Sequence, residues 1–231
     1  MYQRRIGNEV VKHMRRIEDL WQTPGPRPNG LQAAPDGLWV IDAENSHLYK
    51  LDYETGQIIT DVPTDTYKPS GLTVAVDEVW VASTHNSRLY RLNKDGSTIE
   101  YLDPPGVGVR DCRDSGPSYI RPHGMEYLGN GTMWVSIKPA LRNYLVNAST
   151  LSVIKSIPTP GSAPHGIAWD GEALWCGDRA MGAIHKLHPE TGEILEEILV
   201  PDPEVHGLTI HNGSLLFCCD PTRRVCRIAI T

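Results

Sequence analysis

The 231-residue sequence has no long hydrophobic run and no excess of positive charge. No stretch approaches the roughly 20 apolar residues of a membrane helix, and the first residues lack the apolar centre of a secretory signal. The formal net charge is −6, which provides no long-range attraction to nucleic acid or to an anionic membrane. We therefore expect a cytoplasmic protein whose partner is a small molecule rather than nucleic acid or a membrane.

Several familiar chemical motifs are also missing. The sequence has no phosphate-binding loop between a strand and a helix, no nucleophile elbow and no HExxH pattern, so nucleotide chemistry is disfavoured. Five cysteines occur without a CxxC pair. Four of them lie in strand-like runs, which favours buried reduced thiols over disulfides or a zinc site: Cys176, Cys218, Cys219 and Cys226.

An internal repeat runs through most of the chain. It is marked by glycines about 40 residues apart, with one longer interval after the second; these are Gly30, Gly71, Gly124, Gly166 and Gly207. Each glycine opens an apolar run, a second run such as LWVID or LWCGD follows, and most units continue into a third strand and a Thr-Gly or Asp-Gly turn. This pattern predicts an all-β, five-bladed β-propeller with four-stranded antiparallel blades.

The last repeat ends after three strands and needs a fourth from elsewhere. The segment TPGPRPNG before the first blade aligns with TPGSAPHG before the fourth. We therefore expect residues 16–28 to act as a closing strand that completes the last blade. The whole chain, 1–231, is interpreted as one propeller domain in which residues 1–15 form an N-terminal extension of unassigned role. The blades are expected to start near residues 30, 71, 124, 166 and 207.

Two further features concern packing and the surface. A tryptophan recurs at one column of the second strand, which favours packing between blades over a binding cage; the column contains Trp39, Trp80, Trp134 and Trp175, with Leu216 in the fifth blade. The longer interval between repeats contains a loop, residues 104–119, which we interpret as a flap over one face.

The residue before each glycine is expected at the rim of the central channel. These positions hold Asn29, Ser70, His123, His165 and His206. Three converging imidazoles suit a divalent metal with open positions, so His123, His165 and His206 are candidate ligands for zinc, manganese, iron or magnesium. The alternative is that these histidines only line the channel and bond to backbone or water.

Other residues near this rim are candidates for catalysis and substrate binding. Asp178, His85 and Glu126 are candidate catalytic groups, with Asp178 as a base or as a partner that orients a histidine. Candidate substrate-binding residues are Arg179, Lys138, Arg121, Tyr119, Asp42 and Asn29. Two alternatives remain open. Asp178 and Arg179 could form an ordinary ion pair at the rim, and Glu126 could form a hydrogen bond within the ladder of neighbouring strands.

The units APHGIAWDGEALWCGDRAMGAIHKLHPETGEI and PSGLTVAVDEVWVASTHNSRLYRL resemble blades of the streptogramin B (virginiamycin B) lyase and gluconolactonase group. The resemblance implies a channel metal and lyase or lactone-hydrolase chemistry on a small molecule. Streptogramin lyases have more blades and carry glutamates at the end of the second strand, where this chain has Asp42 and Asp178. The chain also resembles the glutamine cyclotransferases of the plant and bacterial type, in its expected number of five blades and in the segment LWVIDAENSHLYKLDYETG.

Taken together, these features favour a metal-dependent lyase or hydrolase that acts on a small, anionic substrate at the histidine-rich rim. Two alternatives stand beside it. One is a propeller that binds a ligand or a protein without catalysis, and the other is acyl transfer of the glutamine-cyclotransferase kind. The substrate, the metal and the oligomeric state are left open by the sequence.

Overall fold

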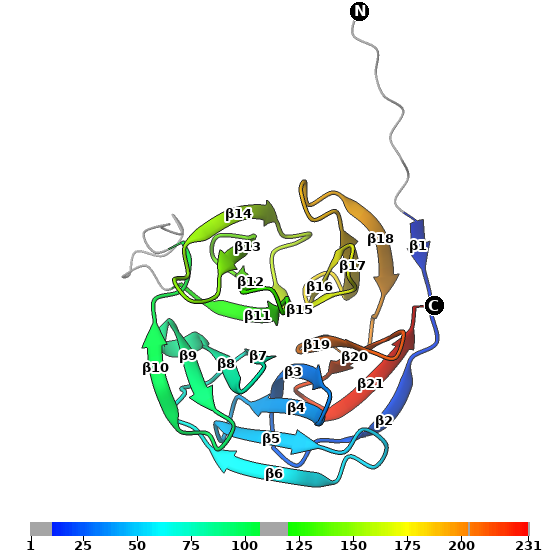
Figure 1. Ribbon diagram of the computed structural model, residues 1–231. Helices are drawn as coiled ribbons and strands as arrows, with labels where there is room; N and C mark the ends of the chain where they lie inside the picture. Colours follow the sequence, from blue (N-terminus) through cyan, green and yellow to red (C-terminus); the bar gives the residue numbers. More distant parts are fainter. Residues whose placement is uncertain (1–10, 107–119, 203, 231) are drawn as a thin grey trace, which may run out of the picture.

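The computed structural model describes residues 11–106, 120–202 and 204–230 of the chain. Figure 1 shows five sheets arranged as a ring around a central axis, with the first strand of each sheet innermost. Each blade is built from four antiparallel strands, and one of the five sheets has a fifth strand at its outer edge. The predicted five-bladed propeller is therefore confirmed. Most of the 104–119 loop, including Tyr119, lies outside the described residues.

The first three blades follow the repeat directly. Blade one contains β3 (Pro28–Ala34), β4 (Gly37–Asp42), β5 (His47–Leu51) and β6 (Ile58–Pro63). Blade two contains β7 (Gly71–Ala75), β8 (Glu78–Ser83), β9 (Arg88–Asn93) and β10 (Thr98–Leu102), with the short 3-10 helix η1 (Thr84–Asn86) after β8. Blade three contains β11 (Pro122–Tyr127), β12 (Thr132–Ile137), β13 (Arg142–Asn147) and β14 (Val153–Pro158).

The last two blades include the N-terminal segment. Blade four contains β15 (Pro164–Trp169), β16 (Leu174–Asp178), β17 (Ala183–Leu187) and β18 (Ile194–Leu199). Blade five contains β19 (Leu208–His211), β20 (Ser214–Cys218) and β21 (Arg224–Ala229). Its outer strand is β2 (Glu18–Gln22), which pairs antiparallel with β21. The predicted closure by an N-terminal strand is confirmed.

The N-terminal segment also contacts the neighbouring blade. β1 (Val11–His13) pairs in parallel with the outer edge of β18, so that blade four gains a fifth strand. Lys12 Nζ lies 2.9 Å from a carboxylate oxygen of Glu197 on β18. One continuous segment therefore joins the outer edges of blades four and five (Figure 1).

The tryptophan column packs between blades, as the repeat predicts. Trp39, Trp134 and Trp175 are each 1% exposed. Each belongs to a core cluster that includes residues of the following blade; Trp39, for example, packs with Val79 and Val81 of β8. The core is thus a set of layers between adjacent blades. The four described cysteines are free and buried, in agreement with the expectation of reduced thiols.

The repeated glycines allow the five innermost strands to approach one another closely. A Cβ atom added at Gly71 would lie 2.7 Å from the carbonyl carbon of His123, and one added at Gly166 would lie 2.5 Å from the carbonyl oxygen of His206. At this level the channel leaves a cavity of about 10 Å³, close to the minimum that one water molecule needs. The constriction separates two mouths of the channel.

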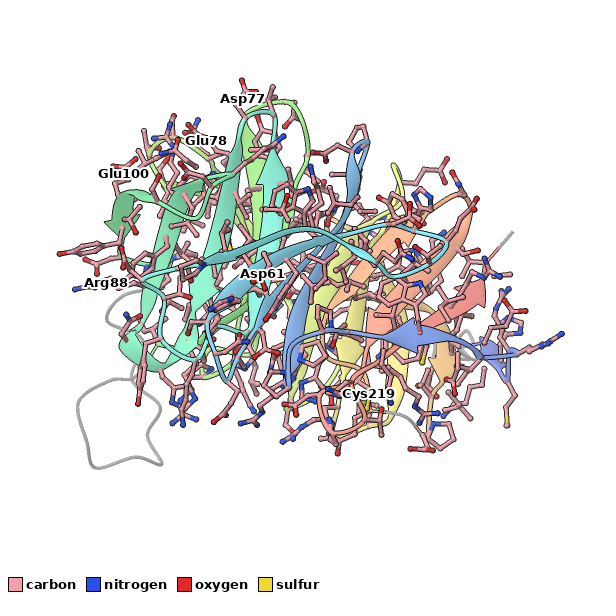
Figure 2. All side chains as sticks on the ribbon, turned by 90° about the horizontal axis from the view of Figure 1, so that it is seen from below. Asp61, Asp77, Glu78, Arg88, Glu100 and Cys219 are labelled. Atoms are coloured by element: carbon pink, nitrogen blue, oxygen red, sulfur yellow. The ribbon has the colours of Figure 1, made fainter. Side chains whose placement is uncertain are left out.

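The two faces of the ring carry different parts of each repeat. In Figure 2, Asp77 in the hairpin after β7 lies at the upper edge, and Cys219 directly after β20 lies at the lower edge. The lower face therefore carries the ends of the second strands and the starts of the innermost strands. Within the described part of the chain, no helix is long and apolar enough to cross a bilayer.

Candidate functional site

Three histidines gather at one mouth of the channel. His123, His165 and His206 precede the constriction glycines on three consecutive blades. The ring centroids of His123 and His165 are 4.8 Å apart, and those of His165 and His206 are 4.9 Å apart, both with edge-to-face geometry. Each side chain is at least nine-tenths buried. The repeated His-Gly dipeptide thus brings together the three imidazoles that the sequence placed on one rim.

Two of the histidines are held in the same way. Nδ1 of His123 lies 3.0 Å from the carbonyl oxygen of Arg121, and Nδ1 of His165 lies 3.0 Å from that of Ala163. A carbonyl oxygen only accepts hydrogen bonds, so Nδ1 carries the proton and donates it. The Nε2 atom of each neutral ring then keeps its lone pair.

Burial keeps both of these rings neutral. It lowers the pKa of His123 to about 3, and the nearby Lys138 acts in the same direction. Burial also lowers the pKa of His165 well below its usual value, with the two neighbouring histidines adding to the effect. Near neutral pH both rings therefore offer a hydrogen-bond acceptor rather than a positive charge.

His206 has a different environment. Its Nε2 atom lies 3.3 Å from a carboxylate oxygen of Glu204, and its Nδ1 atom lies 3.8 Å from a carboxylate oxygen of Asp220. Burial lowers the pKa of His206, whereas Asp220 and Glu204 oppose that decrease. His206 is therefore the histidine of the three whose proton affinity is supported by carboxylates.

Asp220 is the centre of a small polar network that the sequence analysis did not assign. Its carboxylate accepts hydrogen bonds from Nε of Arg27 at 2.8 Å and from Nδ2 of Asn29 at 3.4 Å. Asn29 Oδ1 is buried and has no partner. Asn29 is thus connected to His206 indirectly, through the carboxylate of Asp220. The sequence does contain a signal for the position of Asp220, because this residue follows the second strand at the same repeat position as Lys138 and Arg179.

Three cations surround the histidines on blades three and four. Burial lowers the pKa of Lys138, and Arg179 and Arg121 lower it further by repulsion. Neighbouring positive charges of this kind are stabilised by a bound anion. The structure therefore brings together the three cations predicted to bind substrate. Arg179 lies 3.6 Å from Glu204, so its ion-pair partner is Glu204 and not the adjacent Asp178.

Asp178 and Asp42 have structural roles that differ from the predicted ones. Both are fully buried. One oxygen of Asp178 accepts from the backbone amide of Ala163 at 3.0 Å and the other from that of Met181 at 3.1 Å. Asp42 occupies the equivalent position in blade one and accepts from the amide of Arg27 at 2.5 Å. These carboxylates fix the segments before the innermost strands of blades four and one. The base and substrate-binding roles expected from the sequence stay predictions.

We expect Asp178→Ala to reduce stability rather than catalysis. The substitution leaves the buried amide of Ala163 and the part-buried amide of Met181 without an acceptor, which should lower the free energy of unfolding by about 3 kcal/mol. Denaturant unfolding measures this loss, and Asp42→Ala should show a similar one. A stable Asp178→Ala protein that has lost its ligand chemistry would contradict the structural role.

The two other candidate catalytic residues have environments of their own. His85 is exposed, and its ring contacts Tyr67 edge-on at 6.1 Å. Glu126 lies on β11 beyond the constriction at Gly124, and it interacts with Gln32 instead of a histidine. Burial raises the pKa of Glu126 to about 8. His85 interacts electrostatically with Arg121 and Arg27 and stays a candidate. Glu126 lies beyond the constriction, and Tyr119 falls outside the described residues.

The predicted metal centre does not fit the arrangement of these side chains. His165 contacts both other rings, so the three imidazoles form an arc, and Nε2 of His206 is directed at Glu204. Among the described residues, no group of three or more His, Cys, Asp or Glu side chains is placed to hold a metal ion. We therefore assign no step to a metal.

Comparisons with known proteins support the fold. No family model and no curated protein matches the sequence. Glutaminyl cyclase of Myxococcus xanthus is similar over 95% of this chain and 97% of its own, with a TM-score of 0.73 and 12% identity. Virginiamycin B lyase of Staphylococcus aureus is similar over 93% of this chain and 74% of its own, with a TM-score of 0.53 and 20% identity. These likenesses establish the class, a five-bladed β-propeller.

Proposed function

We propose that this chain is an enzyme that binds a small anionic molecule at the histidine mouth and acts on it as a lyase or hydrolase. The observation that carries the proposal is the joint placement of three buried imidazoles and three cations at one end of a constricted channel. An isolated ion pair or a single buried histidine would not require this arrangement. The cations account for binding, and the histidines account for proton transfer.

In this proposal His206 is the general base. Displacement of the exposed Glu204 by the substrate lets the proton of the neutral ring move from Nε2 to Nδ1, where it faces Asp220. Nε2 then has a free lone pair, and Asp220 stabilises the imidazolium that forms. In the lyase form, Nε2 takes a proton from the carbon next to a carbonyl, and the electron pair of that C–H bond expels the leaving group from the adjacent carbon. Lys138 and Arg121 hold the substrate anion throughout. In the hydrolase form, Nε2 takes the proton from the attacking water.

One similar protein of known structure supports the lyase version of this mechanism. A catalytically inactive variant of Staphylococcus aureus virginiamycin B lyase, in which one histidine is replaced by alanine, has a known structure with quinupristin. It is 22% identical to this chain, with a TM-score of 0.54. Acyl transfer is the second candidate, because the likeness to glutaminyl cyclase extends over nearly the full length of both chains.

The test is a screen of carboxylate-bearing lactones, esters and β-substituted carbonyl compounds, followed by substitutions at the site. We expect His206→Ala to lower kcat by about 100-fold or more with a small change in substrate Kd. Lys138→Met should instead weaken binding about tenfold. The control is His188→Ala in the hairpin between β17 and β18, which should leave both constants unchanged.

Three other results would change the conclusion. Turnover of an N-terminal glutaminyl peptide that depends on His206 would favour acyl transfer. Anion binding that depends on Lys138 without any turnover would favour a binding propeller. Full activity of His206→Ala on a confirmed substrate would overturn the proposed mechanism.

A further inference from the structure

The interface between blades three and four contains polar residues at a fully buried level. Ser136 on β12 is directly opposite Asn143 on β13, and Cys176 on β16 is directly opposite His185 on β17. All four residues are 0% exposed. We call them the polar layer.

The two pairs of the polar layer face each other. Trp134 of blade three packs with Leu174 and Cys176 of blade four. Because side chains alternate along a strand, Ser136 is on the same face as Trp134. Asn143 is directly opposite Ser136 in the register of β12 and β13, so its side chain is on the same face, toward Cys176 of blade four.

The other interfaces are more apolar at the corresponding level. Between blades two and three, Ala82 and Leu89 pack with Val135 and Tyr144. Between blades one and two, the same positions hold Ile41, Leu48, Val81 and Tyr90. The repeat thus supplies an internal comparison, in which one interface has hydroxyl, amide, thiol and imidazole groups where the other two have aliphatic and tyrosine side chains.

Four atoms of the polar layer are buried without a hydrogen-bond partner. They are Ser136 Oγ, Asn143 Nδ2, Asn143 Oδ1 and His185 Nδ1. His185 Nε2 lies 3.2 Å from a carboxylate oxygen of Glu197, so Nε2 donates its proton there. Burial lowers the pKa of His185, which keeps the ring neutral and leaves the lone pair on Nδ1. A buried polar group without a partner destabilises the folded state, so each of these atoms favours a bound partner.

We propose that the polar layer is a binding site for a single buried water molecule that bridges blades three and four. The four unpartnered atoms match the two hydrogen bonds that one water molecule donates and the two that it accepts. The water donates its two protons to Nδ1 of His185 and Oδ1 of Asn143, and it accepts from the Ser136 hydroxyl and the Asn143 amide. Buried waters in proteins make about three such bonds on average.

The water would extend an existing chain of polar contacts. From His185 the chain continues through Glu197 to Lys12 on β1, at 3.2 and 2.9 Å. It therefore connects blade three to the N-terminal strand through the interior of blade four. This connection links the added strand β1 to the neighbouring blade by hydrogen bonds as well as by packing.

The experiment counts long-lived waters by oxygen-17 magnetic relaxation dispersion. The variant combines Ser136→Ala with Asn143→Leu, which introduces the residue types that blade two has at these positions, Ala82 and Leu89. We expect one long-lived water fewer than in the wild type. The matched control combines Ser97→Ala with Asn93→Leu, which removes an exposed serine–asparagine pair 2.9 Å apart and should leave the count unchanged.

A high-resolution crystal structure of the wild type decides the question if the variant does not fold. A water within hydrogen-bonding distance of Ser136, Asn143 and His185 would support the proposal. Direct bonds among these side chains, an anomalous peak from a metal ion, or an unchanged water count in a folded variant would each overturn it.

Discussion

Gly71→Ala is expected to prevent stable assembly of the ring. The added methyl group would lie 2.7 Å from the carbonyl carbon of His123 and closer still to its oxygen. Both are backbone atoms of an innermost strand, so no rotamer change relieves the overlap. We expect a loss of more than about 4 kcal/mol, a large share of the roughly 5–15 kcal/mol that stabilises a typical domain.

Thermal unfolding followed by circular dichroism measures this effect. The expected decrease in Tm is about 10 °C or more, at roughly 2–4 °C per kcal/mol for a chain of this size. Gly129→Ala is the control, because a Cβ there meets nothing within 4 Å and only its φ of 77° disfavours the substitution. That strain costs about 1–2 kcal/mol. Equal losses at the two positions would show that the innermost strands can move apart.

The same glycines explain why the fold could be predicted from the sequence. Each blade needs a glycine at the constriction and a large side chain between sheets, and both requirements recur at fixed positions of the repeat. The closure was visible because the segment before Gly30 resembles the one before Gly166. β1 has no counterpart in any repeat, and its parallel pairing with β18 depends on a long-range contact that no local pattern indicates.

The site was only partly visible in the sequence. The repeated His-Gly dipeptide placed His165 and its two neighbours correctly, because position in the repeat determines position around the axis. Position does not determine which atoms a side chain meets. Asp178 was predicted as a base or as a partner that orients a histidine, and the structure shows that its carboxylate also accepts from a backbone amide in the segment before β15. Asp220 was not singled out, although it connects His206 to Arg27.

Removal of residues 1–23 is expected to have the second large effect, because it deletes the outer strand of blade five. β2 pairs with β21 along most of its length, and Trp21 packs against a core cluster that includes Leu38 and Tyr49. The truncated chain would expose the edge of β21, which invites aggregation. We expect no cooperative unfolding transition and an oligomeric or insoluble product, as measured by calorimetry and size-exclusion chromatography.

Removal of residues 1–16 is the matched control. It deletes β1 and the Lys12–Glu197 ion pair but keeps β2 and Ile17, which packs against the core between blades four and five. The deletion exposes only the edge of β18, so we expect a monomer whose Tm is lower by a few degrees. If β2 closes the ring, adding a peptide of residues 16–28 to the chain that lacks residues 1–23 should restore a cooperative transition. A chain lacking residues 1–23 that stays monomeric and unfolds cooperatively would show that the other strands hold the ring without closure.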